Sequence, residues 1–363
     1  MPGIITHNKI FKESIKHLSR RPKKSYLLRS IEALFSSHEN MRAGLFGSIG
    51  PNIFDYLPSR RGESYCSRNS FYMHDGHMGK FVSAMIDRIY AYDDKNTEWA
   101  AIQRAYAYGM ISHIISDSIF HPYVFYFSGF PDSFDKKQTR YYREQNLLFE
   151  YSMDYYFLYA DENRGDFRFS IDEMLPVKKK IGIPALYPSL RSLLLESLEL
   201  SNPEIYKELT FTAKYQNPDE KYISGFNLVD LIPFFLKTTY NIKFSRNPKL
   251  RDFFQWMKRN SVLFSDFIIQ YPNPKRINRD ILNHHREKWQ YPDGKIGLHY
   301  ESADNLLAIS CEKTIEIWEK IEPVVFGLKG ADTQKDLSVN LYTGSAKTGY
   351  YDMKNKNPIK IQI

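Results

Sequence analysis

One apolar segment, residues 105–122 (AYAYGMISHIISDSIFHP), carries His113, Asp117 and His121 at intervals of four residues. In a helix, residues four apart lie one turn above each other on the same face, so a stacked imidazole and carboxylate can hold one metal ion. Burying these polar groups without a metal ion or another partner would be costly. Because Pro122 disfavours helical geometry in the residue before it, we expect the helix to end at His121 and this side chain to reach a neighbouring metal ion.

A second segment, residues 143–157 (REQNLLFEYSMDYYF), repeats this spacing with Asn146, Glu150 and Asp154. The residues around these three polar side chains are largely apolar. Two apolar helices whose polar stripes face each other predict a buried metal site inside a helical bundle.

The composition is that of a globular chain, and its net positive charge favours negatively charged partners. Of its 363 residues, 42% are hydrophobic and 25% are charged, which allows one large or two medium-sized domains and argues against global disorder. The formal net charge of +8 favours phosphate esters, acidic lipid headgroups or nucleic acid as partners. The clearest basic cluster consists of Arg20, Arg21, Lys23 and Lys24.

The sequence lacks the signals of export and of membrane insertion. It contains no run of about 18 apolar residues, and we expect no signal peptide. Cys66 and Cys311 lie far apart and neither has a second cysteine nearby, so we expect reduced thiols in a cytoplasmic protein.

The apolar spacing predicts an all-α fold, since strand signals are weak throughout. Helices are expected over residues 10–18, 26–35, 71–92, 97–120, 141–159, 187–200, 228–236, 249–267 and 303–321, with a glycine-rich loop over residues 40–60. The polar segment 161–180 is the best candidate for a boundary. We therefore expect a helical core with the metal site (residues 1–165), a helical extension packed on it (residues 166–326) and an irregular tail (residues 327–363), poorly ordered or draped over the surface.

Three further places in the first half of the chain offer metal ligands. His7 comes just before the first expected helix, and the loop GSIGPNIFDY contains Asn52 and Asp55. The segment FYMHDGHMG contains His74, with Asp75 and His77 as neighbouring candidates. Imidazoles and carboxylates in this number suit a cluster of two or three zinc ions.

In their order and spacing, these segments resemble the zinc-dependent phospholipase C family, an all-α fold that is related to the P1-type nucleases and has a trinuclear zinc site. The resemblance rests on MPGIITH, the GPxIF loop, MHxxxxG, YGxxxHxxxDxxxHPY and FExxxDYY. The later segment ILNHHREKWQYP, with the helix that follows it, resembles bacterial cytoplasmic members. The resemblance thus covers most of the chain and implies a helical bundle of this type with additional C-terminal helices.

The resemblance also implies a zinc-dependent phosphoric ester hydrolase, in which metal-bound hydroxide attacks a phosphodiester. His7 would bind one zinc ion, His74 and His113 a second, and Asp117 would bridge the two.

The second polar stripe would complete the site that the resemblance implies. His121 and Glu150 would hold a third zinc ion, and Asp154 would orient a ligand rather than bind metal.

Two residues depart from the pattern of the family. Asn52 stands where the family has an aspartate that binds metal and is a proposed proton acceptor, and Asn146 stands where it has a histidine ligand. An amide is a weak zinc ligand and cannot accept the proton. Asp55 or Asp75 would have to replace the missing base.

These departures leave three functions open. The first is hydrolysis of a phospholipid or another phosphate ester, with transient contact to an anionic membrane. The second is a nuclease-like phosphodiesterase, although nucleic acid is the less favoured partner. The third is a degenerate, non-enzymatic member with an altered metal site. The oligomeric state does not follow from the sequence.

Overall fold

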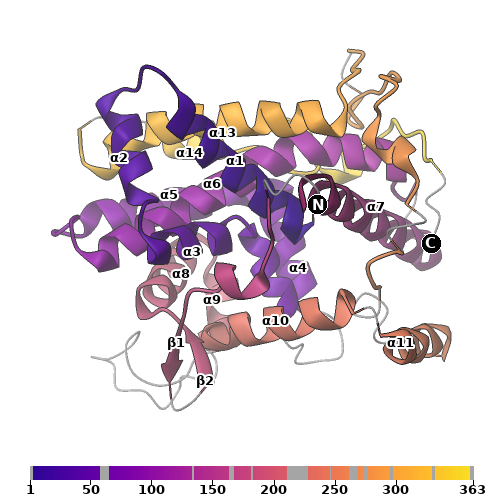
Figure 1. Cartoon of the computed structure of the whole chain (residues 1–363), viewed down its shortest axis with the longest axis horizontal. Helices are drawn as coiled ribbons and strands as arrows, with labels where there is room; N and C mark the ends of the chain where they lie inside the picture. Colours follow the sequence, from indigo (N-terminus) through magenta and orange to yellow (C-terminus); the bar gives the residue numbers. More distant parts are fainter. Residues whose placement is uncertain are drawn as a thin grey trace.

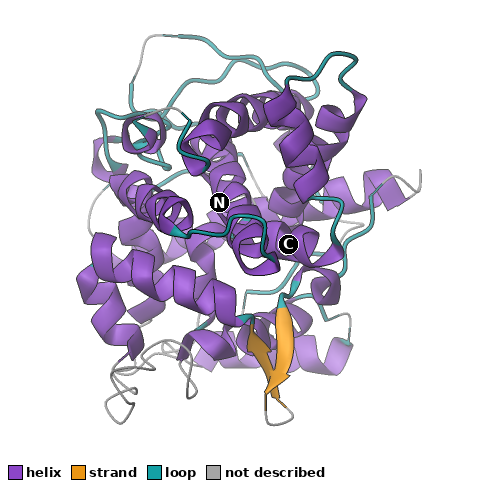
Figure 2. Ribbon diagram, turned by 90° about the vertical axis from the view of Figure 1, so that its left-hand side faces the viewer, coloured by secondary structure: helices purple, strands orange, loops and turns teal. Residues whose placement is uncertain are grey.

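The computed structural model describes residues 3–57, 65–132, 135–162, 167–180, 183–210, 228–245, 247–260, 269–273, 277–294, 297–328 and 332–359. The described residues are largely helical, which confirms the all-α prediction (Figures 1 and 2). Their named strands form one antiparallel hairpin, β1 (Val177–Lys180) and β2 (Ile183–Leu186), in which Val177 pairs with Leu186.

The α-helices follow one another along the whole chain. Their bounds are α1 (Ile4–Arg20), α2 (Tyr26–Leu34), α3 (His38–Gly47), α4 (Tyr65–Tyr72), α5 (Met78–Ala91), α6 (Glu98–Ser128), α7 (Lys136–Glu162), α8 (Pro188–Ser201), α9 (Pro203–Thr210), α10 (Ile232–Lys243), α11 (Pro248–Asn260), α13 (Ala303–Val325) and α14 (Thr333–Leu337). Of the helix expected over residues 249–267, residues 261–267 lie outside the described part. None of the described helices has both the length and the apolar character that a membrane span requires.

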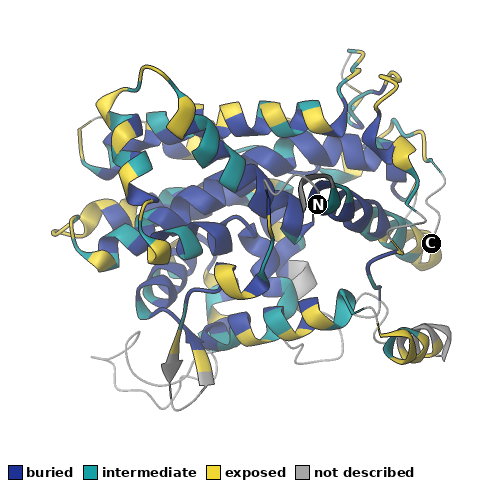
Figure 3. Cartoon of the chain, viewed as in Figure 1, coloured by how far each residue is buried: buried dark blue, intermediate teal, exposed yellow. Residues whose placement is uncertain are grey.

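Helix α6 forms the centre of the fold. It begins at Thr97, whose side chain accepts a hydrogen bond from the Ala100 amide. It packs against α1, α3, α5, α7, α8 and α13, and it is buried along most of its length (Figure 3). A helix that is apolar on nearly all sides is a core helix, so the polar residues of its central turns lie inside the protein.

The expected end of this helix at His121 is wrong. Helix α6 continues through Pro122 to Ser128 and ends before Gly129, whose φ is +85°. Pro122 removes one N–H group from the helix and places its ring against the Ser118 carbonyl, and the packing on all sides outweighs that cost. His121 therefore stays on the same helix face as Asp117.

The prediction of a loop over residues 40–60 is also wrong for its first half, where α3 forms. Gly47 and Gly109 let α3 approach α6 closely instead of breaking the helix, and Gly44 leaves room for the Phe11 ring of α1. A Cβ atom at Gly47 would lie 2.2 Å from the Tyr106 carbonyl oxygen, and one at Gly109 would lie 2.0 Å from that of Gly44. The glycines are thus packing residues, a role that a reading of glycine as a helix breaker misses.

The C-terminal residues 332–359 are mostly irregular, as expected, but they are not draped over the surface throughout. Leu337, Leu341 and Thr343 are fully buried. Helix α14 packs against α5, and the Leu341 amide donates to the His74 carbonyl oxygen at 2.8 Å. These three residues therefore belong to the core, while the division of the chain into three parts stays a prediction.

We expect Gly109→Ala to lower the free energy of unfolding by about 1–3 kcal/mol, because the new methyl group overlaps the α3 backbone. Urea denaturation measures the change. Gly297→Ala is the control, because the nearest atom to its added Cβ lies 3.5 Å away. Equal stability of both variants and the wild type would contradict the close helix contact.

Candidate metal centre

The polar face of α6 lies in the interior of the protein. His113, Asp117 and His121 are each 0% exposed, and Asp117 lies one turn from each histidine. His7 of α1 and His74, which precedes α5, point to the same carboxylate. The structure therefore brings together four of the expected histidines around Asp117.

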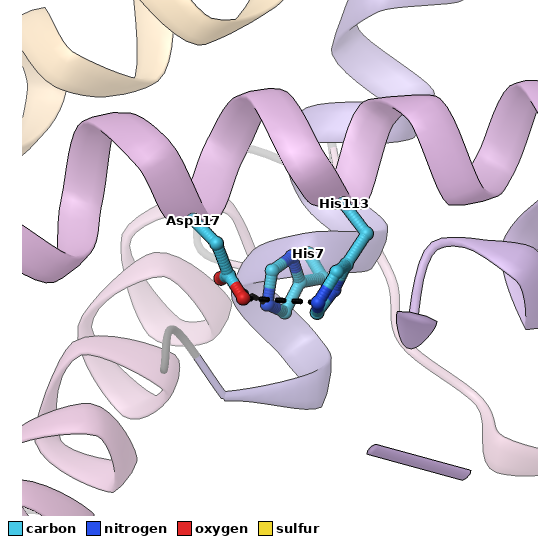
Figure 4. A group of neighbouring side chains, drawn as sticks. All are labelled: His7, His113 and Asp117. Carbon is cyan, nitrogen blue, oxygen red and sulfur yellow. Dashed lines mark ion pairs between the residues drawn. The ribbon is translucent and has the colours of Figure 1, made fainter. Parts of the chain in front are cut away.

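Each carboxylate oxygen of Asp117 faces two imidazole nitrogens. Oδ2 lies 2.9 Å from His113 Nε2 and 3.1 Å from His74 Nε2. Oδ1 lies 3.1 Å from His7 Nε2 and 3.4 Å from His121 Nε2. Figure 4 shows three of these side chains, His7, His113 and Asp117, whose ligand atoms all lie within 4.8 Å of one another.

Backbone carbonyl groups hold the opposite nitrogen, Nδ1, of three of these rings. The acceptors are Ser70 O for His74 at 2.6 Å, Ser48 O for His113 at 3.2 Å and Leu341 O for His121 at 2.8 Å. A carbonyl oxygen can only accept, so each Nδ1 carries a proton, and in the neutral form of each ring Nε2 then presents a lone pair.

The fourth ring, His7, is held by a hydroxyl group. Its Nδ1 lies 2.9 Å from Ser116 Oγ, which itself donates to the carbonyl oxygens of Ser112 at 2.9 Å and His113 at 3.0 Å. Because the Ser116 proton is used in this way, Ser116 accepts the proton of His7 Nδ1. All four Nε2 lone pairs thus point to a carboxylate.

A metal cation fits this arrangement of acceptors. Burial lowers the pKa of His113 and of His121, which keeps both imidazoles neutral. Among the described residues, His7 Nε2, His121 Nε2 and Asp117 Oδ1 are buried without a hydrogen-bond partner. Ligands about 2.0–2.1 Å from a tetrahedral zinc ion lie about 3.3–3.4 Å apart, close to the separations seen around Asp117. Hydrogen bonds from the second ring nitrogen to carbonyl groups are typical of zinc-bound histidines.

His7 is placed by Asp154, which takes no part in the cluster itself. His7 lies inside α1, not before the first helix as expected. The Asp154 carboxylate accepts hydrogen bonds from the Ile5 amide at 3.3 Å, from the Thr6 amide at 2.8 Å and from the Thr6 hydroxyl at 2.7 Å. Tyr271 donates a fourth, at 2.7 Å. These bonds fix the first turn of α1, from which His7 projects.

A π-helical turn, Met73–His77, turns His74 toward the centre. Gly76 has a φ of +94°, and the turn joins α4 to α5. His77 does not join the cluster, since its ring stacks on Tyr72 with 3.7 Å between the ring centroids. Between the two histidines that the sequence offered, the structure therefore selects His74.

Two acidic residues and one amide lie beside the four histidines. Burial, with a smaller contribution from the nearby charge of Asp117, raises the pKa of Glu150 to about 7. Asn52 lies on the 3-10 helix Gly50–Tyr56, and its Oδ1 accepts a hydrogen bond from Ser70 Oγ at 3.1 Å. On the same element, burial raises the pKa of Asp55 to about 6, and Asp55 Oδ1 has no hydrogen-bond partner among the described residues.

Two candidates from the sequence have other contacts. The side chain of Asn146 lies at the end of α6, where Ser128 Oγ is 2.6 Å from its Oδ1. With the amide turned around, its nitrogen donates to Ser128 Oγ, Gly129 O and Tyr142 O instead. Asp75 accepts hydrogen bonds from Asn340 and from the Tyr350 amide. The structure thus gives Asn146 a role in ending a helix and Asp75 a role in holding the C-terminal segment.

Sequence reasoning missed the groups that hold the histidines. Ser116 had a signal, since its hydroxyl lies three residues after His113. Ser48, Ser70 and Leu341 act through backbone oxygens, which leave no trace in the residue type.

Residues 6–181 match the family model described as zinc dependent phospholipase C. This segment belongs to the zinc-dependent phospholipase C family. No curated protein and no solved structure matches the chain. The zinc-dependent phospholipase C segment contains all four histidines and Asp117, whereas Leu341 lies outside it. The family identifies a hydrolase of the phospholipase C type and implies zinc, for which His7, His113 and Asp117 offer a group of ligands.

We expect Asp154→Ala to lower the free energy of unfolding by roughly 3 kcal/mol or more, because several buried donors lose their acceptor. Zinc content should fall as well, since His7 loses its support. Denaturation and elemental analysis measure the two effects. Asp252→Ala, at an exposed position, is the control. Normal zinc content in a destabilised Asp154→Ala would contradict the positioning of His7.

Proposed function

We propose that the chain is a zinc-dependent hydrolase of phosphodiesters, with a phospholipid as its substrate. The observation that carries this proposal is the Asp117 carboxylate, each of whose oxygens lies against two buried imidazole Nε2 atoms. Such a group of acceptors suits two cations bridged by one carboxylate. Membership of residues 6–181 in the zinc-dependent phospholipase C family supports zinc as the cation.

The distances suggest how the ligands divide. His74 and His113 share Asp117 Oδ2 and would hold one ion, whereas His7 and His121 share Oδ1 and would hold the other. The resemblance instead pairs His121 with Glu150 at a third zinc site, and we keep Glu150 as a ligand of that site. This third site is the weaker one, because the Asn146 side chain is turned toward the end of α6. Zinc bound in this way supplies Lewis acidity toward the phosphoryl oxygens and lowers the pKa of water.

We assign the role of proton acceptor to Asp55, because the Asn52 amide cannot accept a proton. Asp55 Oδ1 has no hydrogen-bond partner among the described residues, and the Asp55 side chain lies beside Ser70, which also contacts Asn52. With its pKa raised to about 6 by burial, Asp55 is mostly ionised at neutral pH and can take a proton from the attacking water.

A basic hollow supports transient contact with an anionic membrane. It lies at the turn between α1 and α2 and is lined by Arg21, Pro22, Lys23, Lys24, Arg29 and Glu32. The net charge of +8 adds a general attraction to anionic lipid. We also propose a cytoplasmic location, which agrees with the free, buried thiol of Cys311.

Replacement of the bridging carboxylate tests the proposed centre. Asp117→Ala should lose two zinc ions together, because both depend on this side chain. Hydrolysis of phospholipid should fall by at least about 10²-fold, the loss seen when a group that only supports a ligand is removed. Elemental analysis and release of diacylglycerol measure the two effects.

His284→Ala is the matched control, because His284 is a partly exposed histidine that pairs with Asp304 at 3.1 Å. It should keep the zinc content and the rate of the wild type. Full zinc content in Asp117→Ala would refute the bridge.

The proposed base predicts a pH dependence. Asp55 accepts a proton only as a carboxylate, so kcat/KM should decline as the pH falls through about 6. Asp55→Asn should be slower at neutral pH and should lose this acidic limb, whereas Asp172→Asn, at an exposed position, should keep it. An unchanged profile in Asp55→Asn would exclude Asp55 as the base.

Asn52 and Asn146 favour a second candidate, a binding protein that has kept the fold without the reaction. The same assays decide between the two. A wild type that binds zinc but releases neither diacylglycerol from phospholipid nor nucleotides from nucleic acid supports the binding protein. Release of nucleotides alone supports a nuclease-like phosphodiesterase.

A further inference from the structure

A short C-terminal loop, residues 340–345, lies against the histidine cluster although it is far from the family segment in the sequence. Its two ends pair with each other, since the Asn340 amide donates to the Ser345 carbonyl oxygen at 2.8 Å. Asn340 also binds Asp75, which is the neighbour of His74. The loop is thus attached to the π-helical turn that carries a candidate ligand.

One residue of this loop contacts two of the candidate ligands through its backbone. The Leu341 carbonyl oxygen accepts the Nδ1 proton of His121 at 2.8 Å, and the Leu341 amide donates to the His74 carbonyl oxygen at 2.8 Å. His121 lies on α6, and His74 lies in the turn before α5. Leu341 therefore connects the two elements at the position where their imidazoles face Asp117.

The next residue covers the same two rings. The Tyr342 ring is stacked on His121, with 5.5 Å between the centroids and 13° between the planes. It lies 5.6 Å from the His74 ring, at 30°. An aromatic ring in this position restricts rotation of both imidazoles and keeps water away from them.

The loop is seated where the proline interrupts helix α6. Pro122 has no N–H group, so Ser118 O lacks its usual donor within the helix. Gly344, with a φ of +64°, lies directly over this point, and a Cβ atom there would be 2.4 Å from Ser118 O and 3.3 Å from Pro122 Cγ. Only a glycine satisfies both the backbone conformation and the close approach.

We infer that this C-terminal loop is a positioning element of the metal centre, with Leu341 and Tyr342 setting His121 and His74. The Leu341 carbonyl keeps the proton of His121 on Nδ1, so that Nε2 stays free to bind metal. Without this acceptor, the ring can rotate or carry its proton on Nε2, and it then loses its place in the centre. The inference rests on the proposed zinc binding.

Two matched glycine variants test this role in the full-length chain. Gly344→Val should push the loop away from α6, whereas Gly294→Val places the same side chain at a similar backbone conformation, with a φ of +78° and no atom within 4 Å. Competition with a chromogenic chelator should show zinc binding weakened by about 10–100-fold in Gly344→Val and unchanged in Gly294→Val. In the cobalt-substituted protein, the visible absorption bands should change in Gly344→Val only.

A second pair of variants decides the question if Gly344→Val does not fold. Tyr342→Ala removes the ring that covers the two imidazoles and should weaken zinc binding, whereas Tyr342→Phe keeps the ring and should restore the affinity and the cobalt spectrum. Wild-type affinity and spectrum in a folded Gly344→Val, or in Tyr342→Ala, would overturn the positioning role. If the wild type itself binds no zinc, the proposed function fails along with this inference.

Discussion

The whole centre depends on one buried carboxylate, Asp117, that four imidazole rings surround. Asp117 meets four Nε2 lone pairs because the opposite nitrogen of each ring is held by a carbonyl or hydroxyl oxygen. Such an arrangement is unfavourable in a dry interior unless a cation joins it. With the proposed zinc binding, the folding of the surrounding helices and the binding of metal would be coupled, since the packing that buries these groups also creates the need for a cation.

Glycine residues make the carbonyl acceptors available. Gly47 and Gly109 bring α3 against α6, and α3 ends at Gly47, next to Ser48, whose carbonyl oxygen holds His113. Gly50, with a φ of +66°, continues the same approach, because a Cβ atom there would lie 2.2 Å from the His113 ring. Close packing of backbones thus supplies the acceptors for the second ring nitrogen that carboxylate side chains supply in many known zinc sites.

Much of the centre could be predicted from local spacing. The four-residue steps of His113, Asp117 and His121 are a property of one helix, and an apolar helix has to bury them. The errors arose where tertiary packing outweighed a local rule. Pro122 does not end α6, because the helix is enclosed on all sides, and the glycines of residues 40–60 serve a helix contact instead of a loop.

By itself, the sequence determined the helical class, the candidate ligands on α6 and the resemblance to zinc-dependent phospholipase C, because these follow from residue types at fixed spacing. Only the tertiary structure decided which candidates meet. It selected His74 over His77, turned Asn146 toward the end of α6 and placed the Leu341 carbonyl on His121. These contacts depend on backbone groups and on chain segments far apart in the sequence. Residue types alone do not determine where such groups meet.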